Sequence, residues 1–137
     1  MPNAVNTTIA APRARTVSAL IIDAHATTAG VLRAFLAPAF PQLEILIAQN
    51  AGTAMAINAA QRPALVLVDI HLPDANGIEL LPALRAACPV QQAVVLTLQD
   101  GPLYKERARA AGATAYQTKE HITSALIPLL QSLLPDE

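Results

Sequence analysis

Four polar side chains stand at the ends of short apolar runs, where they could assemble a phosphoryl-transfer site. Asp23 follows VSALII and Asp69 follows LVLV, while Thr97 lies in AVVLTL and Lys119 follows AYQT. Two carboxylates a few ångströms apart repel each other, and a divalent cation with oxygen ligands is the simplest relief. A Mg²⁺ ion there would also balance an incoming phosphoryl group, with the hydroxyl and the ammonium holding its remaining oxygens.

Short β-branched runs alternate with helical stretches from Thr16 onward, and this alternation predicts the elements that position those side chains. Strands are expected at 17–22, 44–48, 65–68, 93–98 and 115–118. Helices are expected from Thr27 or Thr28 to Pro38, and at about 50–60, 78–88, 102–111 and 122–134. Right-handed crossovers place helices on both faces of a parallel sheet, so the pattern predicts a three-layer α/β/α sandwich. Ligands of such sheets bind beyond the carboxyl ends of the strands, where the four side chains should converge.

Particular residues are expected to set the helix ends. Thr27 or Thr28 should cap the first helix, and Asn50 with Thr53 should open the second. Pro82 fits the third helix only in or near its first turn, and Gly112 should end the fourth. A proline at position 128 should kink the last helix or delay its start.

The composition excludes several classes of protein. The chain has 137 residues, of which 53% are apolar and 14% charged, so it can form one domain with its own core and is too apolar for disorder. Residues 1–15, with two prolines, are expected to form a disordered or loosely docked tail before a domain at 16–134. The single Cys88 cannot form an internal disulfide, which fits a cytoplasmic setting, and it is expected to be buried and inert. A net charge of −1 does not favour binding to nucleic acid or to an anionic membrane surface. No apolar run approaches the ~20 residues that a helix needs to span a bilayer.

Four motifs carry a family resemblance. They are I-I-D-A-H (21–25), L-V-D-I-H-L-P-D-A-N-G (67–77), L-T-L (96–98) and A-Y-Q-T-K (115–119). In this order they resemble the receiver domain of two-component response regulators, over about residues 16–134. The second motif is the most specific, because L-P-x-x-x-G follows the aspartate. His25, Gly30-Val31-Leu32 and Glu120 favour the LuxR-type subgroup, and the resemblance implies the flavodoxin-like strand order 2-1-3-4-5.

The resemblance implies a role for each residue of the site. Asp69 would accept a phosphoryl group from a sensor histidine kinase or a phosphotransfer protein, and Lys119 would pair with that group. Asp23, Asp69 and the backbone carbonyl of His71 would hold Mg²⁺. The domain would be a signalling module whose only catalysis is Mg²⁺-dependent self-phosphorylation from phosphodonors. His25 and His71 are not expected to form a metal pair.

The resemblance also implies a switch. Thr97 would hydrogen-bond the phosphoryl group, and Tyr116 matches the aromatic residue that turns inward when the threonine moves. The output face would then be the fourth helix (102–111), the fifth strand (115–118) and the fifth helix (122–134), through which a homodimer could also form. Lys and Arg are not clustered on one predicted face, so this chain is not expected to bind nucleic acid directly. Whether an output domain follows in the native protein stays open.

Three residues depart from the family pattern and keep alternatives open. Ala24 stands where a second acid usually contacts the metal, so Mg²⁺ binding should be weakened. Leu98 replaces a small residue beside the acceptor, and Glu120 replaces a frequent proline. Ala24 therefore favours the alternative of a non-phosphorylated pseudo-receiver that serves as a protein–protein interaction module. An enzyme that binds a nucleotide or flavin is disfavoured, because neither G-x-G-x-x-G nor G-x-x-x-x-G-K-[ST] occurs.

Overall fold

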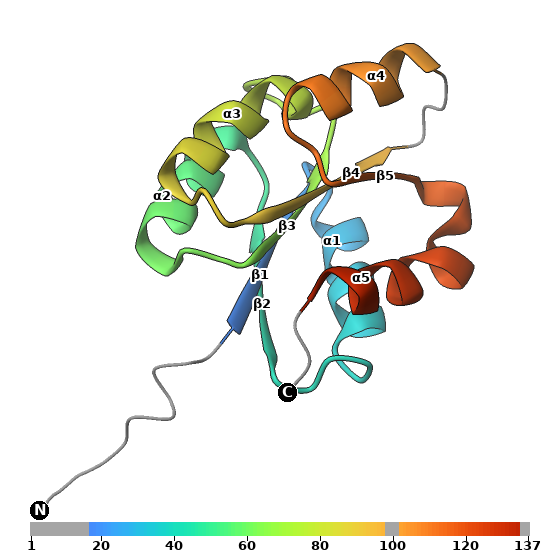
Figure 1. The fold of residues 1–137 in the computed structure, drawn as a ribbon. Helices are drawn as coiled ribbons and strands as arrows, with labels where there is room; N and C mark the ends of the chain where they lie inside the picture. Colours follow the sequence, from blue (N-terminus) through green and yellow to red (C-terminus); the bar gives the residue numbers. More distant parts are fainter. Residues whose placement is uncertain (1–16, 98–101, 135–137) are drawn as a thin grey trace, which may run out of the picture.

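A parallel sheet of five strands organises residues 17–97 and 102–134, the part of the chain that the computed structural model describes (Figure 1). Its strands lie in the order β2-β1-β3-β4-β5, which confirms the predicted order and fold class. The expected tail at 1–15 and Leu98 lie outside the described residues. The strands are β1 (Val17–Ile22), β2 (Leu43–Ala48), β3 (Leu65–Asp69), β4 (Gln92–Thr97) and β5 (Ala115–Thr118).

Helices cover both faces of the sheet, as the crossovers require. On one face lie α2 (Ala51–Gln61), α3 (Gly77–Ala87) and α4 (Pro102–Ala110), and on the other lie α1 (Ala26–Leu36) and α5 (Ile127–Leu133) (Figure 1). A 3₁₀ turn (Lys119–His121) and a π-helical turn (Ile122–Leu126) connect β5 to α5. None of the helices in the described part of the chain is both long and apolar enough to span a membrane.

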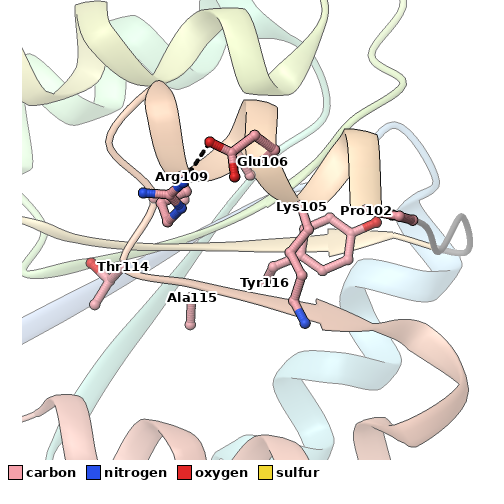
Figure 2. Close-up of a pocket in the computed structure, with 9 residues that line it drawn as sticks. Pro102, Lys105, Glu106, Arg109, Thr114, Ala115 and Tyr116 are labelled. Carbon is pink, nitrogen blue, oxygen red and sulfur yellow. Dashed lines mark hydrogen bonds and ion pairs between the residues drawn. The ribbon is translucent and has the colours of Figure 1, made fainter.

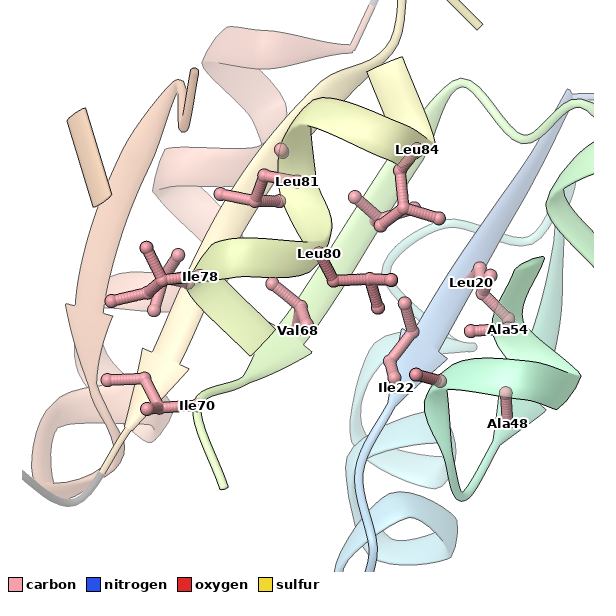
Figure 3. Packing of buried hydrophobic residues seen from close by; sticks show 14 of the residues in the cluster. Leu20, Ile22, Ala48, Ala54, Val68, Ile70, Ile78, Leu80, Leu81 and Leu84 are labelled. Atoms are coloured by element: carbon pink, nitrogen blue, oxygen red, sulfur yellow. The ribbon is translucent and has the colours of Figure 1, made fainter. Parts of the chain in front are cut away.

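The central strands are buried on both sides, which explains their unbroken apolar runs. Leu20 and Ile22 of β1 pack toward α2 and α3, whereas the alternate residues Ala19 and Ile21 pack toward α1 and α5. Figure 3 shows the leucines of α3 against the side of the sheet that carries Val68. The fully buried residues of both halves of the core are aliphatic.

Two predictions about helix ends are wrong. Helix α1 begins at Ala26 with His25 as its N-cap residue and without a side-chain cap, so neither Thr27 nor Thr28 caps it. The reason is local, because the N–H of His25 is held by Asp23 Oδ1 at 2.9 Å and the chain enters the helix directly after β1. Pro82 lies in the second turn of α3 rather than the first. The burial of leucines on the same helix offsets the hydrogen bond that the proline cannot make.

The other helix signals are confirmed. Asn50 caps α2 by accepting the N–H of Thr53 at 2.7 Å. Gly112 follows α4 with a φ of +107°, a backbone conformation that residues other than glycine rarely adopt. Pro128 lies in the first turn of α5, whose start it delays to Ile127. Cys88 is buried, as expected.

The loop between β3 and α3 is tied to a second helix by one carboxylate. Asp74 accepts the N–H groups of Ala51 (2.7 Å) and Gly52 (3.0 Å) at the start of α2, whose first turn has no acid of its own. These two hydrogen bonds stabilise the ionised carboxylate and lower the pKa of Asp74 below its ordinary value of 3.8. The loop that follows Asp69 is therefore anchored to α2.

Replacing Asp74 by alanine is expected to reduce the free energy of unfolding at neutral pH. A carboxyl group whose pKa is depressed by folding contributes stability above its ordinary pKa, and the contribution is lost as the pH falls through the folded value. The difference between wild type and Asp74→Ala should therefore be greatest near neutral pH and narrow below 3.8, as measured by urea unfolding at a series of pH values. The difference between wild type and Asp74→Asn should narrow over the same pH range, because the titrating carboxyl belongs to the wild type, but it should be smaller at neutral pH because asparagine keeps an acceptor. A difference that does not change with pH would contradict the prediction.

Candidate functional site

Three of the four predicted side chains meet at the carboxyl edge of the sheet. The ammonium of Lys119 donates to Asp23 Oδ2 at 3.1 Å and to Asp69 Oδ2 at 3.2 Å. The register of β1 and β3 pairs Ile22 with Val68, so the aspartates that follow these residues lie level on adjacent strands. Lys119 is the first residue after β5 and reaches back across the sheet edge. The convergence predicted from strand ends is thus found for these three residues.

The site is buried and unequally charged. Asp23 is 3% exposed and Asp69 8%, and the side chain of Lys119 is 13% exposed. Two carboxylates against one ammonium leave one negative charge uncompensated within this trio. Buried carboxylates of this kind are stabilised by a bound cation, so the charge of the trio suits a positive ion.

His25 joins the two aspartates and was missed by sequence reasoning. Its Nδ1 lies 3.4 Å from Asp23 Oδ1. One potential ligand atom from each of Asp23, His25 and Asp69 lies within 4.8 Å of the other two, and within residues 17–97 and 102–134 no other three metal-ligating side chains gather in this way. The signal available in the sequence is the position of His25 two residues after Asp23, whereas the metal pair considered for His25 above is with His71.

Thr97 lies at the same edge of the sheet as the charged trio. It is buried as the last residue of β4, and the register of β3 and β4 pairs Asp69 with the preceding residue, Leu96. Its own partner in the register of β4 and β5 is Thr118, directly before Lys119. The structure thus places the hydroxyl-bearing residue between the strand ends that carry the acceptor candidate and the lysine.

Tyr116 and His71 are the two remaining residues of the predicted site. Tyr116 lies within β5, half-buried, and packs against the core cluster beneath α4. The side chain of His71 is exposed, and its backbone forms an antiparallel bridge with Asn76 in the loop after β3. Neither placement by itself assigns a role.

A pocket of about 460 Å³ lies between α4 and β5 (Figure 2). Tyr116 forms part of its wall, close to Lys105 and Pro102 of α4. On the same helix Arg109 pairs with Glu106, and this ion pair lowers the pKa of the Glu106 carboxyl. The pocket belongs to the face predicted to switch, not to the carboxylate site.

Lys119→Met is expected to destabilise the protein in metal-free buffer by about 3 kcal/mol, because it leaves two buried carboxylates without their ammonium partner. Mg²⁺ should restore more stability to this variant than to the wild type, since the ion replaces the missing positive charge. Urea unfolding with and without MgCl₂ measures both effects. Lys105→Met, on the exposed side of α4, is the matched control and should change neither. Equal stability of Lys119→Met and wild type without Mg²⁺ would contradict the expectation.

Comparison with known proteins agrees with this architecture. A family model described as the response regulator receiver domain matches residues 19–131. The photosynthetic apparatus regulatory protein RegA of Rhodobacter capsulatus is 35% identical over 120 residues, covering 85% of this chain and 64% of RegA. The DNA-binding transcriptional activator DevR/DosR of Mycobacterium tuberculosis is 32% identical over 105 residues, covering 76% of this chain and 48% of the activator. The chain therefore spans about half to two thirds of the length of these curated relatives.

Solved structures show the same fold. The CheY-like receiver domain protein of Methanospirillum hungatei JF-1 superposes with a TM-score of 0.76 at 27% identity, covering 85% of this chain and 91% of that one. The receiver domain of a DNA-binding response regulator from Colwellia psychrerythraea 34H gives a TM-score of 0.80 at 24% identity, and the match covers 85% of this chain and 97% of that one. The strand order and the layers are thus those of known structures.

Proposed function

Since the chain belongs to the response regulator receiver domain family, we propose that it is a phosphoacceptor signalling domain in which Asp69 takes a phosphoryl group from a sensor histidine kinase or a phosphotransfer protein. The observation that carries the proposal is the contact of Lys119 with both Asp69 and Asp23 at the carboxyl edge of the sheet. We assign the domain to residues 16–134, with 1–15 as a tail, and place it in the cytoplasm.

The proposed transfer uses Asp69 as the nucleophile. One carboxylate oxygen attacks the phosphorus of the donor phosphohistidine in line; the new P–O bond forms as the P–N bond breaks, and the electron pair leaves on the imidazole. The product is an acyl phosphate. The ammonium of Lys119 pairs with the phosphoryl oxygens, and the hydroxyl of Thr97 donates a hydrogen bond to them.

A divalent cation fits the residues present. Two buried carboxylates with one uncompensated negative charge are a suitable donor set for a hard cation. Asp23, Asp69 and the backbone carbonyl of His71 would hold Mg²⁺, which would supply charge neutralisation for the transferring group. Ala24 contributes no oxygen from its side chain, so we expect weaker Mg²⁺ binding than a second acid would give.

We propose that Thr97 and Tyr116 pass the phosphorylated state to the face made by α4, β5 and α5. Adjacent strands carry these two residues, and the register pairs Val95 with Tyr116 and Thr97 with Thr118. Tyr116 also lines the pocket beside α4, so a movement of its ring would change that surface. A downstream partner or a second copy of the chain would bind there.

The proposal is tested by incubating the protein with acetyl phosphate and Mg²⁺ and following the intact mass. A covalent phosphoryl adduct that hydroxylamine removes is expected, and chelation of Mg²⁺ should prevent it. Beryllofluoride with Mg²⁺ should shift the amide resonances of residues near Asp69 in the same sample.

A pseudo-receiver is the second candidate, and Ala24 is the observation that favours it. This candidate predicts neither an adduct nor a beryllofluoride response at saturating Mg²⁺. That pair of negative results would replace the phosphoacceptor proposal with a binding module.

A further inference from the structure

The two oxygens of Asp23 face different partners. Oδ2 accepts the ammonium of Lys119 at 3.1 Å, whereas Oδ1 accepts the backbone N–H of His25 at 2.9 Å and lies 3.4 Å from the Nδ1 atom of the same histidine. A cation held at Oδ1 therefore need not displace the ammonium from Oδ2. The imidazole lies on the side of the carboxylate that Lys119 leaves open.

The spacing of these atoms suits a shared metal ion. Nitrogen and oxygen ligands lie about 2.0–2.2 Å from a zinc-like ion, so two ligands of one ion are roughly 3 to 4.4 Å apart. The 3.4 Å between His25 Nδ1 and Asp23 Oδ1 is within that range. The set of three, completed by a carboxylate oxygen of Asp69, lies within 4.8 Å, so side-chain adjustments of a few tenths of an ångström would bring it to coordinating distance.

The chemistry of the set differs from that of an all-oxygen site. Mg²⁺ takes oxygen ligands in a near-ideal octahedron, whereas imidazole favours divalent transition metals. Position 24 offers no carboxylate, and the next residue offers a nitrogen. The side chain of His25 is 74% exposed, so its ring is free to turn toward the carboxylates while water keeps access to the ion.

We propose that His25 Nδ1 acts with Asp23 and Asp69 as the third side-chain ligand of the cation site, and that this site takes a divalent transition metal in preference to Mg²⁺. The inference rests on the proposed cation site of the phosphoacceptor function. It names the residue that replaces the absent second acid and the class of ion that this replacement selects.

The experiment measures the affinities of the full chain for Co²⁺ and for Mg²⁺ by titration calorimetry. Binding of Co²⁺ is also followed by proton NMR. Loss of a coordinating or orienting residue typically lowers metal affinity 10- to 100-fold, so the affinity of His25→Ala for Co²⁺ should fall at least about tenfold and its affinity for Mg²⁺ less than about twofold. The wild type should show the strongly shifted proton resonances of one imidazole bound to Co²⁺, and His25→Ala should lack them. His121→Ala, which removes a histidine outside the proposed cation site, is the matched control and should keep those resonances.

A second variant guards against an effect on folding. His25→Asp supplies an oxygen in place of the nitrogen, so its affinity for Mg²⁺ should rise while its affinity for Co²⁺ falls. Unchanged Co²⁺ affinity in His25→Ala, with shifted imidazole resonances retained, would overturn the role of His25 and leave the proposed cation site standing. Failure of the wild type to bind either ion would overturn that site as well.

Discussion

Asp69→Asn is expected to abolish the phosphoryl adduct formed from acetyl phosphate and Mg²⁺. The amide is a poor nucleophile and cannot form an acyl phosphate, so incorporation should fall to background rather than decrease by a factor. The variant should still fold, because one ion pair between Lys119 and Asp23 remains when the second carboxylate is neutralised. Intact-mass measurement after a fixed incubation gives the adduct fraction, and urea unfolding confirms the fold.

Asp74→Asn is the matched control for that measurement. It makes the same chemical change in the loop that follows Asp69, but the side chain of Asp74 accepts hydrogen bonds from the start of α2 and does not contact Lys119. The control should take up the phosphoryl group as the wild type does. Similar adduct fractions in Asp69→Asn and wild type would show that the phosphoryl group is carried elsewhere and would remove the basis of the proposed mechanism.

Gly77→Ala is expected to cost about 4 kcal/mol or more of the free energy of unfolding, an unusually large loss for one added methyl group. A Cβ at position 77 would lie 1.9 Å from the carbonyl oxygen of Asp69 and 2.9 Å from its carbonyl carbon. These are backbone atoms at the end of β3, so no side-chain rotation can relieve the overlap. Either α3 must move away from the sheet or the peptide group of Asp69 must shift, and both change the candidate site.

Gly30→Ala tests whether the effect is specific to the close approach. Gly30 lies inside α1, and a Cβ there would meet no atom within 4 Å. Because alanine is the better helix former, this variant should gain about 0.5–1 kcal/mol. Urea unfolding gives the change in the free energy of unfolding of each variant relative to wild type. Equal changes for the two substitutions would refute the steric argument.

Strand positions followed from the sequence because each buried strand is a short apolar run with a polar end. β1 and β5 have the predicted bounds, and the meeting of Asp23 with Asp69 follows from adjacent parallel strands ending at one edge. The position of Lys119 followed from the same rule. These features depend on residue type and strand direction alone.

The features that were missed depend on contacts made after the chain has folded. The start of α1 is set by the hydrogen bond from the N–H of His25 to Asp23, and this contact also brings the imidazole to the carboxylates. Pro82 is tolerated because leucines of α3 are buried against the sheet, an energy that local propensity does not include. The role of Asp74 required the knowledge that α2 begins beside the loop after β3.

The lysine that touches both aspartates lies 96 positions after Asp23 and 50 after Asp69. The carboxylates of Asp23 and Asp69 therefore have no ammonium of Lys119 beside them until β5 has docked on β4. The charged trio is assembled only when the last strand of the sheet is in place.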